Sequence, residues 1–404
     1  MQKKNYIESI AIILISVLPI AFIVGSAAVN SFIILLDFLF LYELFNKKKF
    51  NYLNNKYFYS FILLWIILLL SLFFSSNIEN SSSRAIGFFR FIIFVFSIRY
   101  FFNLENKNLQ KIIINTWALI FIVISFDLIF EYIYGVNIIG IKSPMHGRLV
   151  SFLGDELKIG SLYFALITLV LSGIYYLMAF KEKNYYFKKV IFYLFIFSFL
   201  IISYMIGERS NFIKVLILIV FFIFFHEKKN YLIKTSFILL SAIVIYFVTT
   251  LNEHIKHRAW TTFLKPIINN PVTAIVNSQY GLLYEVGIKM YQNNKVFGVG
   301  LKNFREEIIK DEYNNAGSNH PHQFHFEILA ELGLIGYFSF FIFFLFNISL
   351  SIKNYIKEKN LFNLSGTLFV LCSLIPLLPS GSFFTSFGAA LFWINFAIML
   401  PKKN

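Results

Sequence analysis

The sequence predicts an all-α integral membrane protein that crosses the bilayer about 12 times and forms one membrane domain over residues 1–404. Of the 404 residues, 58% are hydrophobic and only 14% are charged, whereas an average soluble domain is about 45–50% apolar and about 25% charged. The apolar residues also gather into runs long enough to span a bilayer as helices. This composition excludes a water-soluble globule, and it excludes a disordered chain, which requires low hydrophobicity and high charge.

Each apolar run is expected to form one transmembrane helix, because a helix satisfies its own backbone hydrogen bonds in lipid. The first run follows the basic segment MQKKN, but it is longer than the apolar part of a signal peptide and another run follows almost at once. We therefore expect an uncleaved span. The predicted spans cover residues 7–28, 31–45, 58–75, 85–103, 112–134, 159–180, 190–206, 211–225, 235–251, 326–350, 363–379 and 386–400.

Basic residues predict the orientation. The segments on the N-terminal side of the membrane hold 20 Lys and Arg residues, and the opposite short loops hold five, Arg84 among them. By the positive-inside rule, both termini are cytoplasmic. The same rule accounts for the net charge of +15, so no nucleic-acid partner is expected. The single cysteine, Cys372, excludes a disulfide framework within one chain.

One large hydrophilic segment, residues 252–325, lies between the ninth and tenth predicted spans. The orientation places it on the outer face of the membrane as one large loop. In residues 280–292, apolar residues recur at the spacing of an amphipathic helix. Residues 293–304 are predicted to form a glycine-containing turn followed by a short helix. The segment is therefore predicted to form a helical cap on the membrane domain.

Three histidines, His320, His322 and His325, lie within six residues at the end of this loop. Histidine titrates near neutral pH and serves as a general acid or base, and a histidine cluster can also bind a metal ion. Apart from Glu327 and Glu331, no acidic residue or cysteine stands at a familiar ligand spacing, so no metal is expected. The alternative is a set of interfacial histidines that bond to the loop backbone.

Arginines near the outer face form the second group of candidates. Arg209 stands in the short turn GERSNF, and Arg148 stands in GRLVSFLGDELKIGS together with Asp155. Arginine binds phosphate oxygens in a bidentate manner. The alternatives are a pair between Arg209 and Glu208, contact of Arg209 with lipid headgroups, and an internal Arg–Asp pair in the second segment.

Arg90 lies one or two turns inside the fourth predicted span. A charge inside the membrane is costly, so it is a functional candidate by default. Asp127 and Glu131 are four residues apart, and therefore on one helix face near the outer end of the fifth span. They are alternative structural partners for such an arginine.

Arginines near the membrane plane and a histidine beside them suit an anionic lipid substrate with a phosphate or diphosphate leaving group. The arginines would neutralise the leaving group, and the histidine would deprotonate an acceptor. The sequence contains no P-loop, and no nucleotide is supplied outside the membrane. The chemical energy must then arrive with a lipid-linked donor.

The histidine segment carries a recognisable spacing. His322 and Gln323 are followed by nine residues, Gly333, two residues and Gly336. This pattern resembles the motif of the O-antigen ligase and polymerase superfamily of bacterial envelope proteins. The Thr-x-Trp that follows in the ligase form is absent, since Tyr337 and Ser339 stand there. The arginine-bearing segments, VFGVGLKNF, the twelve spans and the loop position are also similar to that family.

The resemblance implies an inverting glycosyltransferase of the bacterial inner membrane that works on the periplasmic side without metal or cofactor. Its donor would be a glycan on undecaprenyl diphosphate. Its acceptor would be lipid A-core in a ligase, or a second lipid-linked glycan in a polymerase. Carried over, His322 would activate the acceptor hydroxyl, while Arg148 and Arg209 would hold the diphosphate; Arg90 is added because of the cost of burying it. The supporting residues would be His320, Gln323, His325, Asp155, Gly333 and Gly336.

Three functions stay open at this point. Ligase is preferred over polymerase because of the spacing from His322 to Gly336. A polysaccharide transporter or flippase is the third, since intramembrane charges can line a path, but the two halves of the chain lack the evident repeat that many transporters carry. A purely structural scaffold would not need arginines at membrane depth.

Overall fold

The computed structural model of the chain describes residues 6–104, 107–154, 156–178, 184–226, 231–251, 253–310, 313 and 317–401. In these ranges every regular element is a helix and no strand occurs. The prediction of an all-α protein is therefore confirmed.

Helices stand at all twelve predicted span positions. In the described part of the chain, nine are long and apolar enough to cross a membrane, while α16, α17 and the apolar part of α9 are shorter. A multi-pass membrane protein is thus supported, and the number twelve stays a prediction. The helices are α1 (Tyr6–Val24), α2 (Ser26–Asn46), α3 (Lys56–Leu70), α4 (Ile78–Phe102), α5 (Lys107–Tyr134), α6 (Ile159–Leu177), α7 (Tyr185–Met205), α8 (Arg209–His226), α9 (Tyr231–Leu251), α15 (Phe324–Glu358), α16 (Leu361–Ser373) and α17 (Ser386–Met399).

The start of α4 differs from the prediction. It begins at Ile78, seven residues before the predicted limit, because the Asn77 side chain caps it and accepts from the Glu79 and Asn80 amides at 3.1 and 3.3 Å. Such a cap stabilises a first turn even where the residues are polar. Arg84, expected in a short loop, therefore lies on a helix.

The end of α16 also differs. The predicted span ran to residue 379, but the helix stops at Ser373 and residues 374–385 form an irregular loop before α17. Pro376 and Pro379 explain the early end, because proline lacks the N–H that a helix interior requires. We call this segment the 374–385 loop.

The bundle has an inner and an outer set of helices. In the most apolar window of α6, 83% of residues are buried inside the protein, against 28% in α3. The exposed side chains of α3 are large and apolar, such as Leu63, and Phe73 follows it in the short η2 turn (Ser71–Phe74). An apolar outer surface of this kind faces lipid, because in water it would be a patch that soluble monomers avoid.

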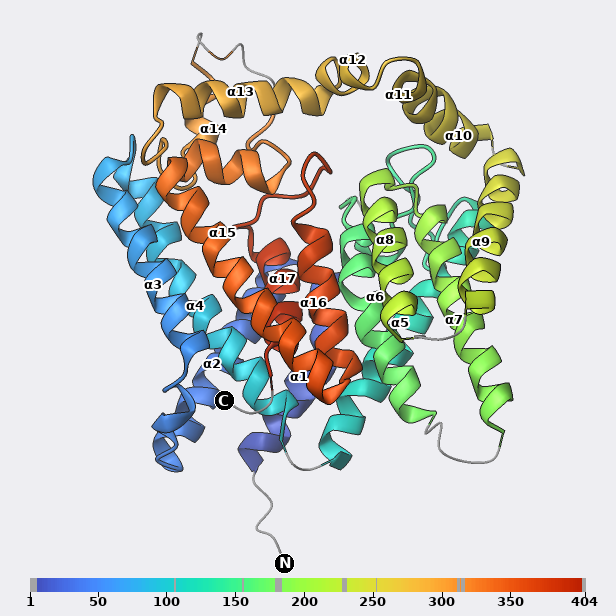
Figure 1. The fold of residues 1–404 in the computed structure, drawn as a ribbon, viewed down its shortest axis with the longest axis horizontal. Coiled ribbons are helices and arrows are strands. Elements are labelled where there is room, and N and C mark those ends of the chain that lie inside the picture. Colours follow the sequence, from blue (N-terminus) through green and yellow to red (C-terminus); the bar gives the residue numbers. More distant parts are fainter. Residues whose placement is uncertain are drawn as a thin grey trace, which may run out of the picture.

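The predicted cap forms a row of short helices that arches over one end of the bundle from α9 to α15 (Figure 1). Leu283 and Met290 of this row pack with Val299, Phe304 and Ala330 in a small hydrophobic core of their own. The cap is therefore held to the bundle by packing as well as by the chain. Its elements are α10 (Glu253–Lys256), a π-helical stretch η4 (His257–Leu264), α11 (Lys265–Asn269), α12 (Pro271–Val276), α13 (Gln279–Asn293) and α14 (Phe304–Glu307).

The two described ends of the chain lie at the end of the bundle opposite the cap (Figure 1). Glu8 in α1 pairs with Lys47 after α2, with the Lys47 Nζ 2.6 Å from the carboxylate. Arg99, in the last turn of α4, donates to the Pro401 carbonyl at 3.0 and 2.9 Å. This arrangement fits an even number of crossings, as the orientation prediction requires.

Candidate active site

The histidine motif forms the end of the cap loop and the start of α15. Gln323 is the N-cap of α15, and its Oε1 accepts from the His325 and Phe326 amides at 2.7 and 3.2 Å. An N-cap satisfies amides that have no partner within the helix. The supporting role predicted for Gln323 thus has a structural basis: it fixes where the helix begins and hence where His322 stands.

His322 is held by its neighbours on both sides. Its backbone adopts the left-handed conformation (φ 54°), which is uncommon outside glycine. Its amide donates to Nδ1 of His320 at 3.0 Å, and its carbonyl accepts from the Ser380 amide at 2.7 Å. The His320 and His322 rings are 3.9 Å apart at their centroids, and the Tyr280 ring lies 5.7 Å from His322 on another side.

Both of these histidines are neutral near pH 7. Burial lowers the pKa of His320 to about 4, helped by His322, Arg305 and Arg84. Burial also lowers the pKa of His322, and a backbone hydrogen bond to Ser380 opposes that shift in part. Nδ1 of His320 accepts a hydrogen bond, so its proton is on Nε2. A neutral His322 is in the form that a general base requires.

His325 is tied into the bundle by both ring nitrogens. Nε2 lies 2.8 Å from the Leu374 carbonyl and Nδ1 lies 3.2 Å from the Tyr337 hydroxyl. The carbonyl can only accept, so Nε2 carries the proton and Nδ1 accepts from the tyrosine. His325 therefore joins α15 to the 374–385 loop, and its ring contacts are structural.

Gly333 breaks α15. Its backbone (φ 61°, ψ −160°) is not helical, and a Cβ there would strike the backbone of Val296 and Gly298. The amides of Val299 and Gly300 donate to carbonyls just before the break, at 2.9 and 2.8 Å. The amides of Leu334 and Ile335 donate back to Lys295 and Val296. Glycine is required here because the cap segment lies against the helix backbone. Gly336 crowds only Leu332 of its own helix.

The two arginine segments lie directly against each other. The Leu149 amide donates to the Ile206 carbonyl at 3.0 Å, and a Cβ on Gly207 would collide with the Gly147 carbonyl. Arg148 pairs with Glu208 at 2.5 Å and donates to the Leu157 carbonyl. Among the described residues, the ion pair of Glu208 is thus with Arg148 of the other segment, whereas the alternative considered above paired Glu208 with its neighbour Arg209. Asp155 lies outside the described residues.

Arg209 faces the site from the start of α8. Its guanidinium lies over the Phe263 ring of the cap, 5.3 Å from the centroid. It also interacts electrostatically with Tyr280 and Arg148. Tyr280 contacts the His322 ring and lies within electrostatic range of Arg209, so the arginine turns and the histidine motif face the same region under the cap.

In the described part of the chain, Asp127 and Glu131 bond to backbone amides and a serine hydroxyl and form no ion pair with an arginine, unlike the alternative considered above. Asp127 accepts from the Ile138 amide at 2.8 Å and the Ser151 hydroxyl at 2.5 Å. Glu131 accepts from the Val150 and Ser151 amides at 3.1 and 2.7 Å. These buried carboxylates shape the loop that carries Arg148.

Arg90 of α4 contacts α17 and faces α2. It donates to the Ser386 hydroxyl of α17 at 3.2 Å and interacts electrostatically with Asp37 of α2. The segments that carry Arg148 and Arg209 contact each other directly, and Arg90 belongs to neither segment. The structure thus brings together two of the three arginines predicted to hold a diphosphate.

An apolar cavity of about 290 Å³ opens beside Arg209. It lies where α7, α8 and α9 meet the cap, and Gly147, Gly207, Glu208 and Arg209 are part of its wall. The remaining lining residues are mostly apolar: Tyr204, Phe212, Ile213, Ile245, Thr249, Trp260, Phe263 and Leu264. An apolar cavity with Arg209 in its wall suits a lipid that carries an anionic group.

The 374–385 loop is the part of the site that the sequence did not predict. Lys214 of α8 donates to its Pro379 carbonyl at 2.9 Å, and the loop's Ser380 amide holds His322. Glu327 accepts from the Ser382 hydroxyl and from the Phe383 amide at 2.9 Å. The two prolines and the Ser-Gly-Ser run were the available signal of a loop, but they did not indicate its contacts.

Within the described residues, no group of three or more His, Cys, Asp or Glu side chains is arranged to hold a metal ion.

Fold and site together define a multi-pass helical membrane protein with a histidine and a pair of arginines beneath a helical cap. Residues 192–341 match the family model described as O-antigen ligase. This match includes the histidine motif, and it confirms the resemblance of that part of the chain to the O-antigen ligase and polymerase superfamily. None of the curated proteins compared with the chain matches it.

Proposed function

We propose that the protein is an O-antigen ligase. It transfers a glycan from undecaprenyl diphosphate to lipid A-core on the periplasmic face of the inner membrane. The observation that carries the proposal is the apolar cavity lined by Arg209, whose turn lies against the turn of Arg148, together with Tyr280, which contacts the His322 ring.

His322 acts as the general base. In its neutral form it removes the proton from the acceptor hydroxyl as the oxygen attacks the anomeric carbon of the donor. The new glycosidic bond forms on the face opposite the bond to the diphosphate, which breaks, so the anomeric configuration inverts. The proton passes from His322 to solvent. A hydrogen bond between the His322 ring and the backbone of Ser380 orients the ring for this step.

Arg148 and Arg209 stabilise the departing diphosphate. The guanidinium group of arginine binds two phosphate oxygens at once. In many enzymes, stabilisation of developing charge in a site shielded from water accounts for most of the rate enhancement. The isoprenoid next to the diphosphate occupies the cavity beside Arg209. Undecaprenyl diphosphate stays in the membrane as the leaving group. Arg90 remains an untested candidate for the same role.

Polymerase is the second candidate. The absence of Thr-x-Trp, with Tyr337 and Ser339 in those places, favours it. The base and the leaving group would be the same, and only the acceptor would change to a second lipid-linked glycan.

The test uses cells that lack the protein, complemented with the wild type, His322→Ala or the control His257→Ala. His257 is an exposed histidine of the cap. Surface lipopolysaccharide is run on a gel, undecaprenyl-linked glycan is extracted from the same cells, and protein levels are compared by immunoblot. If the protein is a ligase, lipid A-core stays bare and long chains accumulate on undecaprenyl diphosphate in the null cells and in the His322→Ala cells. Cells with the wild type or His257→Ala show neither change.

Other outcomes redirect the proposal. If single repeat units still reach lipid A-core but the ladder is lost, the protein is a polymerase. If His322→Ala behaves as the wild type at equal protein level, the base mechanism is rejected. A transporter, which needs no proton acceptor at this position, then becomes the better explanation.

A further inference from the structure

Two arginines that the mechanism does not use lie on the His320 side of the motif. Arg84 is on α4 and Arg305 is on α14. Both interact electrostatically with His320, whose ring contacts His322. His320 and Tyr280 both contact the His322 ring; Arg84 and Arg305 lie within electrostatic range of His320, and Arg209 lies within electrostatic range of Tyr280.

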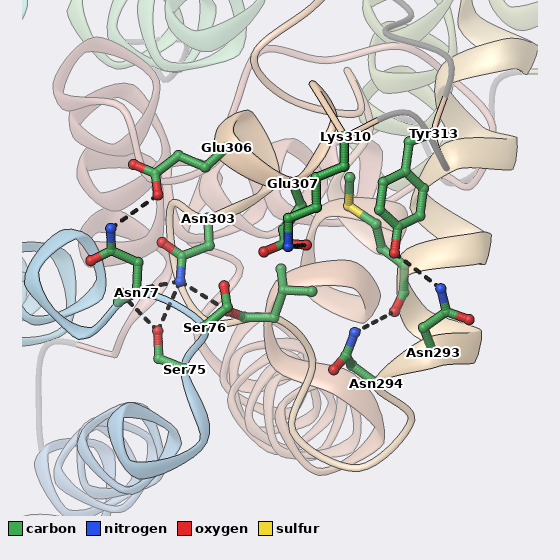
Figure 2. A network of polar contacts seen from close by, with 12 residues as sticks. Ser75, Ser76, Asn77, Asn293, Asn294, Asn303, Glu306, Glu307, Lys310 and Tyr313 are labelled. Carbon is green, nitrogen blue, oxygen red and sulfur yellow. Dashed lines mark hydrogen bonds and ion pairs between the residues drawn. The ribbon is translucent and has the colours of Figure 1, made fainter.

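Polar contacts hold the elements that carry Arg84 and Arg305 together. Glu306, next to Arg305, accepts from the Asn77 side chain at 3.0 Å (Figure 2) and from the Asn80 side chain. Asn80 is one turn before Arg84 on α4, so the two side chains lie on the same face. The Arg84 guanidinium lies 5.7 Å from the centroid of the Phe384 ring.

The guanidinium groups keep their hydrogen-bond donors available. In the part of the chain that the structure describes, neither Arg84 nor Arg305 donates a hydrogen bond or forms an ion pair within 4 Å. Arginine has five N–H donors in a planar fork. Arg84 is half-buried and Arg305 is exposed. An anionic ligand that arrives from the outer face can therefore accept hydrogen bonds from both guanidinium groups.

Two buried glutamates lie near these arginines but are engaged elsewhere. Glu327 accepts from Ser382 and Phe383, while Glu331 faces the backbone amides of Lys302 and Phe304. Both interact electrostatically with Arg84 at longer range. They offset the cost of placing the cations at the edge of the bundle without occupying the guanidinium donors.

We propose that Arg84 and Arg305, with His320 between them and His322, form a second anion site that binds a phosphate group of the acceptor saccharide. The proposal rests on the proposed transferase function. The donor diphosphate lies on the Arg148 and Arg209 side, and the charged acceptor lies on the other, so that its hydroxyl reaches His322.

The first experiment measures acceptor binding without any transfer. Full-length protein in nanodiscs is titrated with phosphorylated lipid A-core and with the same glycolipid after phosphatase treatment. The wild type is expected to bind the phosphorylated form about tenfold more tightly, as expected for one or two charge-assisted hydrogen bonds. The Arg84→Gln/Arg305→Gln variant is expected to bind both forms with the weaker affinity.

The control variant is Lys289→Gln/Lys295→Gln, which removes the same charge from two exposed lysines of the cap region. It is expected to keep the wild-type preference. If wild type and the arginine variant show the same preference for phosphate, the second anion site is refuted, whatever the transfer assay shows.

The second experiment measures transfer from undecaprenyl diphosphate-linked glycan. The arginine variant is expected to raise the KM for the phosphorylated acceptor about tenfold and to leave the KM for the donor unchanged. A raised donor KM would assign Arg84 and Arg305 to the donor diphosphate and overturn the proposal. Absence of transfer by the wild type, with the binding preference intact, would count against the transferase function alone.

Discussion

At the scale of single residues, the site depends on histidines that stay neutral. His320 gives its Nδ1 lone pair to the His322 amide, which a protonated imidazole could not do. The left-handed backbone of His322 is held between this bond and the one to Ser380. Protonation of His320 would therefore loosen the backbone of the proposed base.

The first prediction concerns pH. The pKa of His322 is lowered from about 6.5, so transfer activity is expected to be constant from pH 6.5 to 8 and to fall at lower pH.

The lowered pKa of His320 affects folding. The unfolded chain binds more protons than the folded chain between about pH 4 and 6.5, so the stability of the fold rises with pH across that window and the His320 contribution is complete above pH 6.5. Profiles of kcat/KM and of thermal stability from pH 4.5 to 8 test this; an acid limb of kcat/KM centred above pH 7 contradicts it.

The second prediction separates two roles of Arg148. The Arg148→Ala variant leaves the buried carboxylate of Glu208 without its cation, which costs about 3 kcal/mol for a buried pair. The reversal Arg148→Glu/Glu208→Arg is expected to recover much of that stability but not the affinity for undecaprenyl diphosphate, because the cation has moved. Thermal unfolding in detergent and binding titrations measure the two effects. Full recovery of affinity in the reversed variant would remove Arg148 from the diphosphate site.

At the scale of elements, the glycine motif works by interrupting α15. The cap segment around Gly298 approaches the helix so closely that four backbone hydrogen bonds join the two. The histidine at the start of α15 and the cap segment are thereby fixed in one unit. The spacing between His322 and Gly333 sets the length of helix between the base and this junction.

The third prediction tests that junction. The Gly333→Ala variant forces a side chain into a positive-φ conformation and against the backbone of Val296 and Gly298, so a loss of at least about 2 kcal/mol is expected. Gly87→Ala is the matched control, since Gly87 is helical and a Cβ there has open space; it is expected to be neutral or slightly stabilising. Thermal unfolding of both variants measures the effect. Equal melting temperatures of the two variants would mean that the junction between the cap segment and α15 does not contribute to stability.

Much of the helical framework could be predicted from the sequence. Apolar runs located twelve helices, because length and hydropathy alone identify a spanning segment. The misplaced ends, at Ile78 and Ser373, depend on a cap and on prolines, which are local features that a hydropathy pattern ignores. Helix ends are set by such side-chain details rather than by composition.

The site was predictable only in its local motifs. The spacing from His322 to Gly336 indicated the histidine, and the outer turns indicated Arg148 and Arg209. Arg84, Arg305 and the 374–385 loop reach the site through the fold, from segments more than 200 residues apart in the first case. No local pattern records a contact of that kind.

At the scale of the whole molecule, the cap is docked on the bundle by a polar network (Figure 2). The Asn303 side-chain amide donates to the hydroxyls of Ser75 and Ser81 and to the carbonyls of Asn77 and Val299, at 2.8 to 3.2 Å. Asn303 is fully buried. The segment before α14 and the start of α4, which carry Arg305 and Arg84, therefore move together.

The fourth prediction tests this docking. Asn303→Ala leaves buried hydroxyls and carbonyls without their donor and is expected to cost about 2 kcal/mol. The loss should appear as faster hydrogen exchange in residues 299–307. Asn294→Ala is the control, since Asn294 is exposed and its side chain donates to the Met290 carbonyl of the preceding turn. Unchanged exchange in the Asn303 variant would show that packing alone holds the cap.

The fifth prediction concerns topology. In a background where Cys372 is replaced by alanine, cysteines are introduced at the exposed positions Lys289 of the cap and Lys48 after α2. A membrane-impermeant maleimide is expected to label position 289 in intact cells and position 48 only after the membrane is opened. Labelling of both from outside would refute the orientation and with it the periplasmic site.

The contact between Arg99 and the Pro401 carbonyl has a practical consequence for expression. The guanidinium is buried and also lies 5.3 Å from the Tyr52 ring and 5.4 Å from the Tyr57 ring, measured to their centroids. A truncation before Pro401 would remove the carbonyl that accepts from both Nε and Nη2 of Arg99 and is expected to lower the yield of folded protein. A purification tag or fluorescent reporter belongs after Pro401, where the peptide carbonyl is kept.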